Sequence, residues 1–212
     1  DPASNEVVNT VRLGEAPGQD PLEEALGLPD RSFLEGFEEL AFGEGAVWAV
    51  GTDGLARVDP ESLEVTTWSP EQLDLGQVVG SPSEPDDVAA GGGRVWLSVA
   101  VPNDLFAVDP ATGPSERRIG GGDGVAVGAD AVWTLYDIDG ELIRSEPLGG
   151  ITEGSEEIEV GEDPDDVAVG EGAVWVPLSE GRLAKVDPSS LDVEEKVSRP
   201  EGEYDDDLSL RV

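Results

Sequence analysis

Hydrophobic and polar residues alternate along most of this chain in short runs, and glycine or proline ends nearly every run. A representative stretch is DVAV (166–169), then GEG (170–172), then AVWV (173–176). A period of two is typical of a β-strand with one buried face, and a glycine turn between two such runs predicts a hairpin. With 28 glycines and 16 prolines, the composition also suits a chain of short strands and frequent turns.

A nine-residue unit of this kind occurs four times without a gap. The copies are LAFGEGAVW (40–48), VAAGGGRVW (88–96), VAVGADAVW (125–133) and VAVGEGAVW (167–175). Each copy predicts two strands, here named A and B. A third strand, C, ends in Val-Asp-Pro at 58–60, 108–110 and 186–188, with Glu146-Pro147 as a degenerate copy. An alternating polar segment such as 191–197 predicts an outer strand, D.

Units of four strands that repeat roughly every 40 residues indicate the blades of a β-propeller. We expect one β-propeller domain over 1–212, with blades at approximately 37–68, 85–119, 122–160 and 164–197. Residues 1–11 match an exit turn and strand D, and 206–210 match the start of strand A. The prediction is four complete four-stranded blades plus an N-terminal strand D and a C-terminal strand A, as a segment of a larger propeller. A closed four-bladed ring with decorated ends is the alternative.

Two segments interrupt the repeat. The longer is an insertion at 14–36, in which Pro21, acidic residues and Gly27 predict a short helix over 21–27. The second is an extension over 69–85. Insertions on one face of a repeat array often carry binding, but for each of these segments taken alone the sequence favours a plain loop.

The repeated VAVGxGAVW and Val-Asp-Pro segments resemble the YVTN and streptogramin-lyase-like group of β-propellers, which overlaps with NHL-type repeats. The resemblance covers nearly the whole chain and implies the propeller fold. Such repeats occur in secreted proteins, in surface proteins and as sensor parts of larger regulators, so it also implies a place outside the cytoplasm, extracellular or in the cell envelope, and fusion to further domains. The virginiamycin B lyase-like enzymes of this group use a histidine base and a divalent metal, whereas this chain has no histidine.

The charge is strongly negative, with 48 acidic against 12 basic residues and a formal net charge of −36. Nucleic-acid backbones and anionic membrane surfaces would repel such a protein. The acids form either a solvated coat, as in salt-adapted proteins, or a cation-binding face. No apolar stretch reaches the length of a membrane span, so we expect no membrane insertion. The chain begins with Asp1 and lacks methionine, which suggests a processed product or an excerpt.

Acidic pairs precede strand A in successive blades. Every strand A should begin at the same end of the propeller, so these carboxylates should form a ring there, joined by loop acids. Ca²⁺ binds six to eight oxygen ligands, which such a ring could offer. The ring contains the pair Glu38 and Glu39 of the first blade and the candidate metal ligands Asp86, Asp87, Asp123, Asp165, Asp166, Asp206 and Asp207. The loop acids that join it are Asp53, Asp104, Asp137, Asp139 and Glu180. The alternative is that these acids are solvated turn residues.

The remaining motifs have structural explanations. The tryptophans of strand B, at 48, 96, 133 and 175, suit the wedge between blades, while Trp68 lies outside this pattern. The Asp of each Val-Asp-Pro should accept backbone N–H groups in a turn. With no His, no Cys and no complete catalytic motif, we expect no catalytic or cofactor-binding residues.

The sequence therefore predicts a non-catalytic binding, sensing or scaffold module that presents an acidic loop face to a small-molecule ligand or a protein partner. Two alternatives remain. One is a metal-dependent lyase whose catalytic histidine lies outside this segment, and the other is a salt-adapted scaffold without a small ligand.

Overall fold

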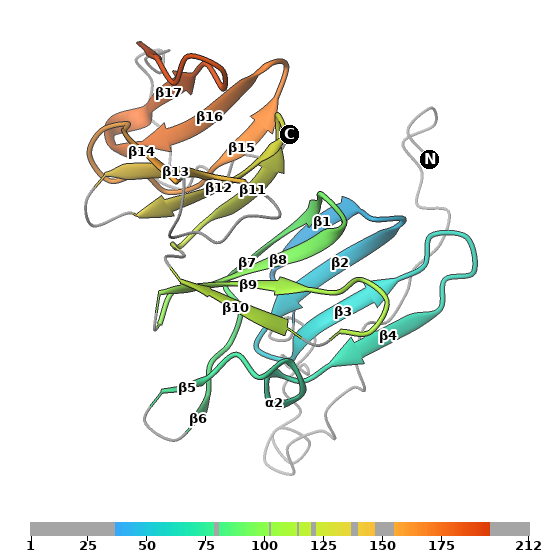
Figure 1. The fold of residues 1–212 in the computed structure, drawn as a ribbon. Coiled ribbons are helices and arrows are strands. Elements are labelled where there is room, and N and C mark those ends of the chain that lie inside the picture. Colours follow the sequence, from blue (N-terminus) through green and yellow to red (C-terminus); the bar gives the residue numbers. More distant parts are fainter. Residues whose placement is uncertain are drawn as a thin grey trace, which may run out of the picture.

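The computed structural model describes residues 37–195, except 79–80, 102, 114, 120–121, 137–139 and 147–154. This part is all-β, with four antiparallel four-stranded sheets that follow one another along the chain (Figure 1). The predicted fold class is thus confirmed. The predicted strands at 1–11 and 206–210 and the insertion at 14–36 lie outside the described residues.

Each sheet is one blade with the predicted order A, B, C, D. Blade 1 contains β1 (Glu39–Gly43), β2 (Ala46–Gly51), β3 (Gly54–Val58) and β4 (Val65–Trp68). Blade 2 contains β7 (Asp87–Gly91), β8 (Arg94–Val99), β9 (Asp104–Val108) and β10 (Ser115–Ile119). Blade 3 contains β11 (Val125–Gly128), β12 (Ala131–Tyr136), β13 (Glu141–Ser145) and β14 (Glu156–Glu159). Blade 4 contains β15 (Ala168–Gly170), β16 (Ala173–Leu178), β17 (Arg182–Val186) and β18 (Val193–Glu195).

The A–B turn of each nine-residue unit requires left-handed backbone. In blade 1, Glu44 and Gly45 have φ values of 51° and 74°, and in blade 4 Glu171 and Gly172 have 52° and 75°. Two consecutive residues with positive φ form the kind of tight hairpin turn that matches strand twist. Glycine adopts a positive φ with less steric strain than any other residue, which explains why most copies have glycine at the second turn position.

The blades pack through their inner strands, β1 on β7, β7 on β11 and β11 on β15. Glycines at the ends of these strands allow the close approach. A Cβ atom at Gly91 would lie 2.7 Å from Cγ1 of Val127, and one at Gly128 would lie 2.6 Å from Cγ1 of Val169. Among the described residues, β15 and β1 form no comparable contact, so these four blades form an open series.

Three of the four strand-B tryptophans lie between described blades, as predicted, and Trp175 of blade 4 is partly buried. Trp48, Trp96 and Trp133 are fully buried, and each belongs to a hydrophobic cluster that joins its blade to the next. In all four blades the indole Nε1–H donates to the carbonyl of the glycine that ends strand A, at 3.0–3.2 Å. The ring thus fills the wedge while its polar group is satisfied.

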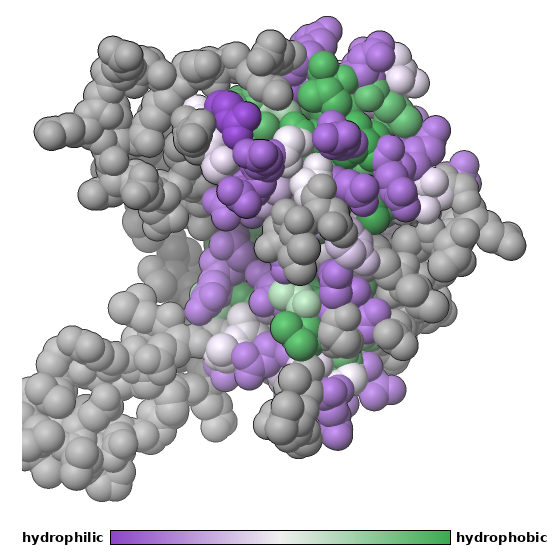
Figure 2. Space-filling view, turned by 90° about the vertical axis from the view of Figure 1, so that its left-hand side faces the viewer, coloured by the Kyte–Doolittle hydropathy of each residue, from purple (hydrophilic) through white to green (hydrophobic). Residues whose placement is uncertain are grey.

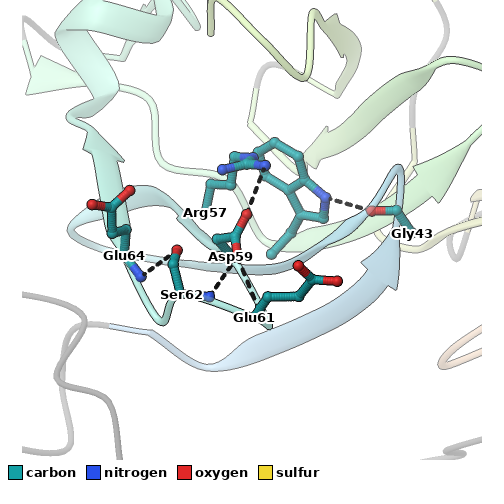
Figure 3. Close-up of polar contacts among 7 residues, drawn as sticks. Gly43, Arg57, Asp59, Glu61, Ser62 and Glu64 are labelled. Carbon is teal, nitrogen blue, oxygen red and sulfur yellow. Dashed lines mark hydrogen bonds and ion pairs between the residues drawn. The ribbon is translucent and has the colours of Figure 1, made fainter.

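The Val-Asp-Pro segments are turns held by the aspartate. Asp59 Oδ1 accepts the backbone N–H of Glu61 at 3.0 Å and of Ser62 at 2.9 Å (Figure 3). Asp109 and Asp187 accept equivalent pairs of N–H groups. These bonds hold the pKa of each carboxyl below its ordinary value, since they favour the charged form. The structural interpretation of these residues is confirmed.

The extension over 69–85 contributes to the core. Ser69 begins the short helix α2 (Pro70–Leu73) with a capping box formed with Gln72, and β5 (Gln77–Val78) pairs with β6 (Ser81–Pro82). Leu73 and Leu75 are buried in the cluster between blades 1 and 2. Trp68 stacks on Trp48 with ring centroids 6.4 Å apart, so this aromatic is also part of the packing.

Candidate functional site: the acidic face

The first ends of the inner strands lie together at one end of the blade series. Oδ2 of Asp87, the first residue of β7, accepts the N–H of Val125, the first residue of β11, at 2.8 Å. At the other end of these strands, Glu44 Oε1 accepts the N–H of Gly93, which joins the A–B turns of blades 1 and 2. Adjacent inner strands therefore run in the same direction. We call the end that carries the acids preceding strand A the acidic face; its described acids are Glu38, Glu39, Asp86, Asp87, Asp123, Asp165 and Asp166.

The Asp87 carboxyl accepts hydrogen bonds from two backbone N–H groups. Besides the bond to Val125, its Oδ1 accepts the N–H of Val88 at 2.7 Å. Asp166 makes the matching bond to the N–H of Val167 at 2.7 Å. The repeat accounts for both, because an aspartate directly before the first apolar residue of strand A can accept the N–H that begins the strand.

The Asp87 carboxyl also has an altered pKa. Burial raises this pKa to about 7, the N–H groups of Val125 and Val88 oppose the rise, and the charges of Asp166 and Glu39 add to it. Asp166 and Glu39 belong to blades 4 and 1, so carboxylates from three blades share one electrostatic field. The sequence placed all three acids in the predicted ring, with Asp87 and Asp166, but not Glu39, among the candidate metal ligands.

The other predicted residues occupy different positions. Asp86 is exposed, and its Oδ2 accepts the N–H of Ala100 at 2.6 Å. Asp165 is exposed and donates its backbone N–H to the carbonyl of Pro177 at 3.2 Å. The carbonyl of Asp123 accepts from the hydroxyl of Ser98, a buried residue of β8 that sequence reasoning did not single out. Asp206 and Asp207 lie outside the described residues.

Of the neighbouring loop acids, Asp53 is exposed and Asp104 is buried at the start of β9. Asp137 and Asp139 lie outside the described residues. Within the described part of the chain, no three acidic side chains are arranged to hold a metal ion. An ordered calcium site at the predicted ring therefore stays a prediction.

Basic side chains are paired elsewhere on the blades. The described ion pairs are Arg57–Asp59 at 3.9 Å, Arg94–Asp109 at 3.5 Å, Arg144–Glu156 at 2.8 Å and Lys185–Glu194 at 2.7 Å. None of these four pairs includes an acid of the acidic face. In Figure 2, hydrophilic residues surround smaller hydrophobic patches over the described surface on one side of the molecule. Negative charge on the acidic face is thus not neutralised by these pairs.

A groove of about 740 Å³ lies at the opposite end, between the A–B turns of blades 2 and 3. Residues of both turns, Asp130 among them, line it together with Arg144 and Glu146. The charge of Arg144 is paired with Glu156. The groove therefore combines one paired cation with two acids and is separate from the acidic face.

No helix among the described residues is long and apolar enough to cross a membrane. No family model matches the sequence. No curated protein matches it either.

Solved structures of β-propeller-like proteins are similar to this chain in fold. Hydrazine synthase from Kuenenia stuttgartiensis aligns with a TM-score of 0.59 and 14% identity, over 77% of this chain and 49% of that one. AztD from Citrobacter koseri aligns with a TM-score of 0.52 and 15% identity, over 77% of this chain and 47% of that one. The extracellular domain of BT4673 from B. thetaiotaomicron aligns with a TM-score of 0.55 and 14% identity, over 78% of this chain and 23% of that one. The chain spans about half or less of each of these proteins, and the likeness shows the fold.

Proposed function

We propose that this chain is a non-catalytic β-propeller module that binds or senses a positively charged ligand or protein partner at its acidic face. One observation carries the proposal: the described acids that precede strand A lie at one end of the inner strands, where Asp87 of blade 2 binds the N–H of Val125 in blade 3 and the charges of Asp166 and Glu39 add to the rise of its pKa. Converging like charges in a partly buried setting raise the local negative potential, which attracts cations and basic side chains. A positively charged partner would reduce the repulsion between these acids.

The residues of this face suit binding better than catalysis. The chain contains no His and no Cys to serve as a nucleophile. The one acid of this face with a pKa raised to about 7, Asp87, accepts hydrogen bonds from two backbone N–H groups. Asp86, Asp87 and Asp166 each accept a backbone N–H group, so their orientation serves the fold. These hydrogen bonds orient the acids that would face a partner.

Two similar structures support a place outside the cytoplasm. One is the extracellular domain of BT4673. The other is PorZ of Porphyromonas gingivalis, named as a bacterial surface component of the type-IX secretion system, with a TM-score of 0.53 and 13% identity over 77% of this chain and 21% of that one. The repeat itself supports membership of the YVTN and streptogramin-lyase-like group, because its VAVGxGAVW copies form the A–B hairpins and its Val-Asp-Pro copies form the exit turns of strand C.

Calorimetric titration tests the proposal with two separate probes, a lysine-rich peptide and CaCl₂, at constant ionic strength. The face variant carries Glu38→Gln and Asp165→Asn, both at exposed positions of the acidic face. The control carries Asp130→Asn and Glu171→Gln, exposed positions in A–B turns at the opposite end. Both variants lose two negative charges, so they differ only in where the charge is removed.

We expect the peptide to bind the parent chain and the control alike, and the face variant several-fold more weakly. Equal losses in both variants, or no measurable binding of the peptide, would contradict the proposal. The calcium titration addresses the predicted metal site. Saturable binding that the face variant weakens supports an ordered site, while the same heat in matched NaCl indicates diffuse attraction.

A further inference from the structure

The A–B turns of neighbouring blades are linked differently at the first two junctions. Glu44 holds the first left-handed position in the turn of blade 1, and its Oε1 accepts the N–H of Gly93 in the turn of blade 2 at 3.0 Å. In blade 2, Gly92 occupies the position of Glu44. In blade 3, Asp130 occupies the position of Gly93. Because Gly92 has no side chain, it cannot offer a carboxylate to the N–H of Asp130.

The groove between the A–B turns of blades 2 and 3 lies at this junction. Gly91 and Gly92 line it from blade 2, and residues 127–131 line it from blade 3. A glutamate at position 92 that followed the course of Glu44 would extend into the groove. Its volume of about 740 Å³ lies in the range of small-molecule sites. The fold therefore leaves room for an external carboxylate at the place where blade 1 supplies its own.

Arg144 of β13 adds a guanidinium group to the wall of the groove. Its Nη1 donates to Glu156 at 2.8 Å, while its buried Nε–H meets no acceptor among the described residues. A buried N–H without an acceptor is unfavourable, and guanidinium groups form strong hydrogen bonds with carboxylates. The backbone N–H of Asp130 and the guanidinium of Arg144 thus give one groove two kinds of donor for a carboxylate.

The acidic side chains at the groove limit which carboxylates can bind. Asp130 and Glu146 also line it, and both residues are exposed. The whole chain carries a formal net charge of −36, so a simple anion would be repelled. A ligand that also carries an ammonium group avoids this repulsion and pairs its positive charge with an acid of the groove. α-Amino acids combine the two groups on one carbon atom.

We propose that the groove between the A–B turns of blades 2 and 3 binds a small zwitterion of the α-amino-acid class. The ligand carboxylate accepts the N–H of Asp130 and an N–H of the Arg144 guanidinium, and the ligand ammonium group lies beside Glu146. Val127 and Ala129 line the same groove and suit a small apolar side chain. This site is separate from the acidic face and does not depend on the function proposed for that face.

Chemical shifts of the ¹⁵N-labelled chain, followed in titrations at constant ionic strength, test the proposal with L-alanine, sodium acetate and methylammonium chloride. We expect saturable shifts of the Asp130 amide and the Arg144 Nε–H with L-alanine. Acetate and methylammonium each carry one of the two charges and should bind about tenfold more weakly or not at all. Acetate that binds as tightly as L-alanine, or the absence of saturable shifts with L-alanine, overturns the proposal.

Gly92→Glu supplies the missing carboxylate from the chain itself. Gly92 has a φ of 65° and Glu44 has one of 51°, so this turn position accommodates glutamate. The new side chain should accept the N–H of Asp130 and weaken L-alanine binding about tenfold. Hydrogen exchange of the Asp130 amide without ligand checks the geometry, since the new bond should slow it. Unchanged exchange, or unchanged L-alanine binding, contradicts the comparison with Glu44 and overturns the proposal.

Ala111→Glu is the matched control, because it adds the same charge at the same end of the blades. Ala111 is exposed in the C–D turn of blade 2, where blade 1 has Glu61 at the equivalent position. This control should bind L-alanine as the parent chain does. So should the acidic-face variant with Glu38→Gln and Asp165→Asn, which separates this site from the function proposed above. Equal weakening in Gly92→Glu and Ala111→Glu overturns the proposal.

Discussion

Replacement of Asp87 by asparagine removes a carboxyl whose pKa the fold raises to about 7 from an ordinary 3.8. The largest cause is burial, followed in the same direction by the charges of Asp166 and Glu39. The folded state therefore holds a proton on Asp87 over a pH range in which the unfolded chain has lost it. Stability from this proton is fully present below about pH 4 and is lost as the pH rises through about 7.

At 1.36 kcal/mol for each pH unit between the two pKa values, the whole effect amounts to about 4 kcal/mol. Urea unfolding of the parent chain and of Asp87→Asn, at pH values from 4 to 8.5, measures it. We expect the parent chain to lose up to about 4 kcal/mol relative to the variant over this range. The difference between the two curves isolates Asp87, since all other acids titrate in both proteins.

Two further measurements check that burial is the main cause of the raised pKa of Asp87. Repeating the series in 1 M NaCl should preserve most of the difference, because salt screens Asp166 and Glu39 but leaves burial unchanged. Asp59→Asn is the control of opposite sign. Hydrogen bonds from the backbone N–H groups of Ser62 and Glu61 lower the pKa of Asp59 below its ordinary 3.8, so this control is followed below pH 4. There the parent chain should gain stability over the variant as the pH rises from the lowered pKa toward about 4. Parallel curves for the parent chain and Asp87→Asn would refute the reasoning about Asp87.

Three other substitutions probe the blade packing and one of the turns, and urea unfolding measures the effect of each on stability. Gly128→Val forces its side chain toward Val169 of the next blade and should cost about 1–3 kcal/mol. Trp133→Phe removes the Nε1–H bond to the Gly128 carbonyl from a fully buried site and should cost about 2–3 kcal/mol. Leu63→Gly should gain up to about 1 kcal/mol, because Leu63 has a φ of 62° where the equivalent turn of blade 2 has Gly113. A change of opposite sign in any of the three would contradict the packing described.

Sequence reasoning could predict the blades because the repeat encodes them locally. Strand alternation, the positive-φ turn after Gly43 and the Asp59 turn all depend on residues within a few positions of each other. The four gap-free copies then set the order of strands in every sheet. The repeat also identified Asp87 and Asp166 as equivalent residues at the same end of the propeller.

Features that depend on neighbouring blades could not be predicted. Leu40 and Val88 occupy the same repeat position, yet Leu40 is exposed and Val88 is buried, because among the described residues only Val88 has a preceding blade packed against it. Likewise the raised pKa of Asp87 depends on burial and on charges from blades 1 and 4. The extension over 69–85 looked like a loop, although Leu73 and Leu75 insert into the core.

The claim that the acidic face is the binding surface can be tested most directly by mapping backbone amide chemical shifts during titration with a lysine-rich peptide at constant ionic strength. The account predicts saturable shifts concentrated at 38–39, 86–88, 123–125 and 165–167. Shifts concentrated at the A–B turns 43–45, 91–93, 128–130 and 170–172, or small shifts spread evenly over the surface, would contradict it.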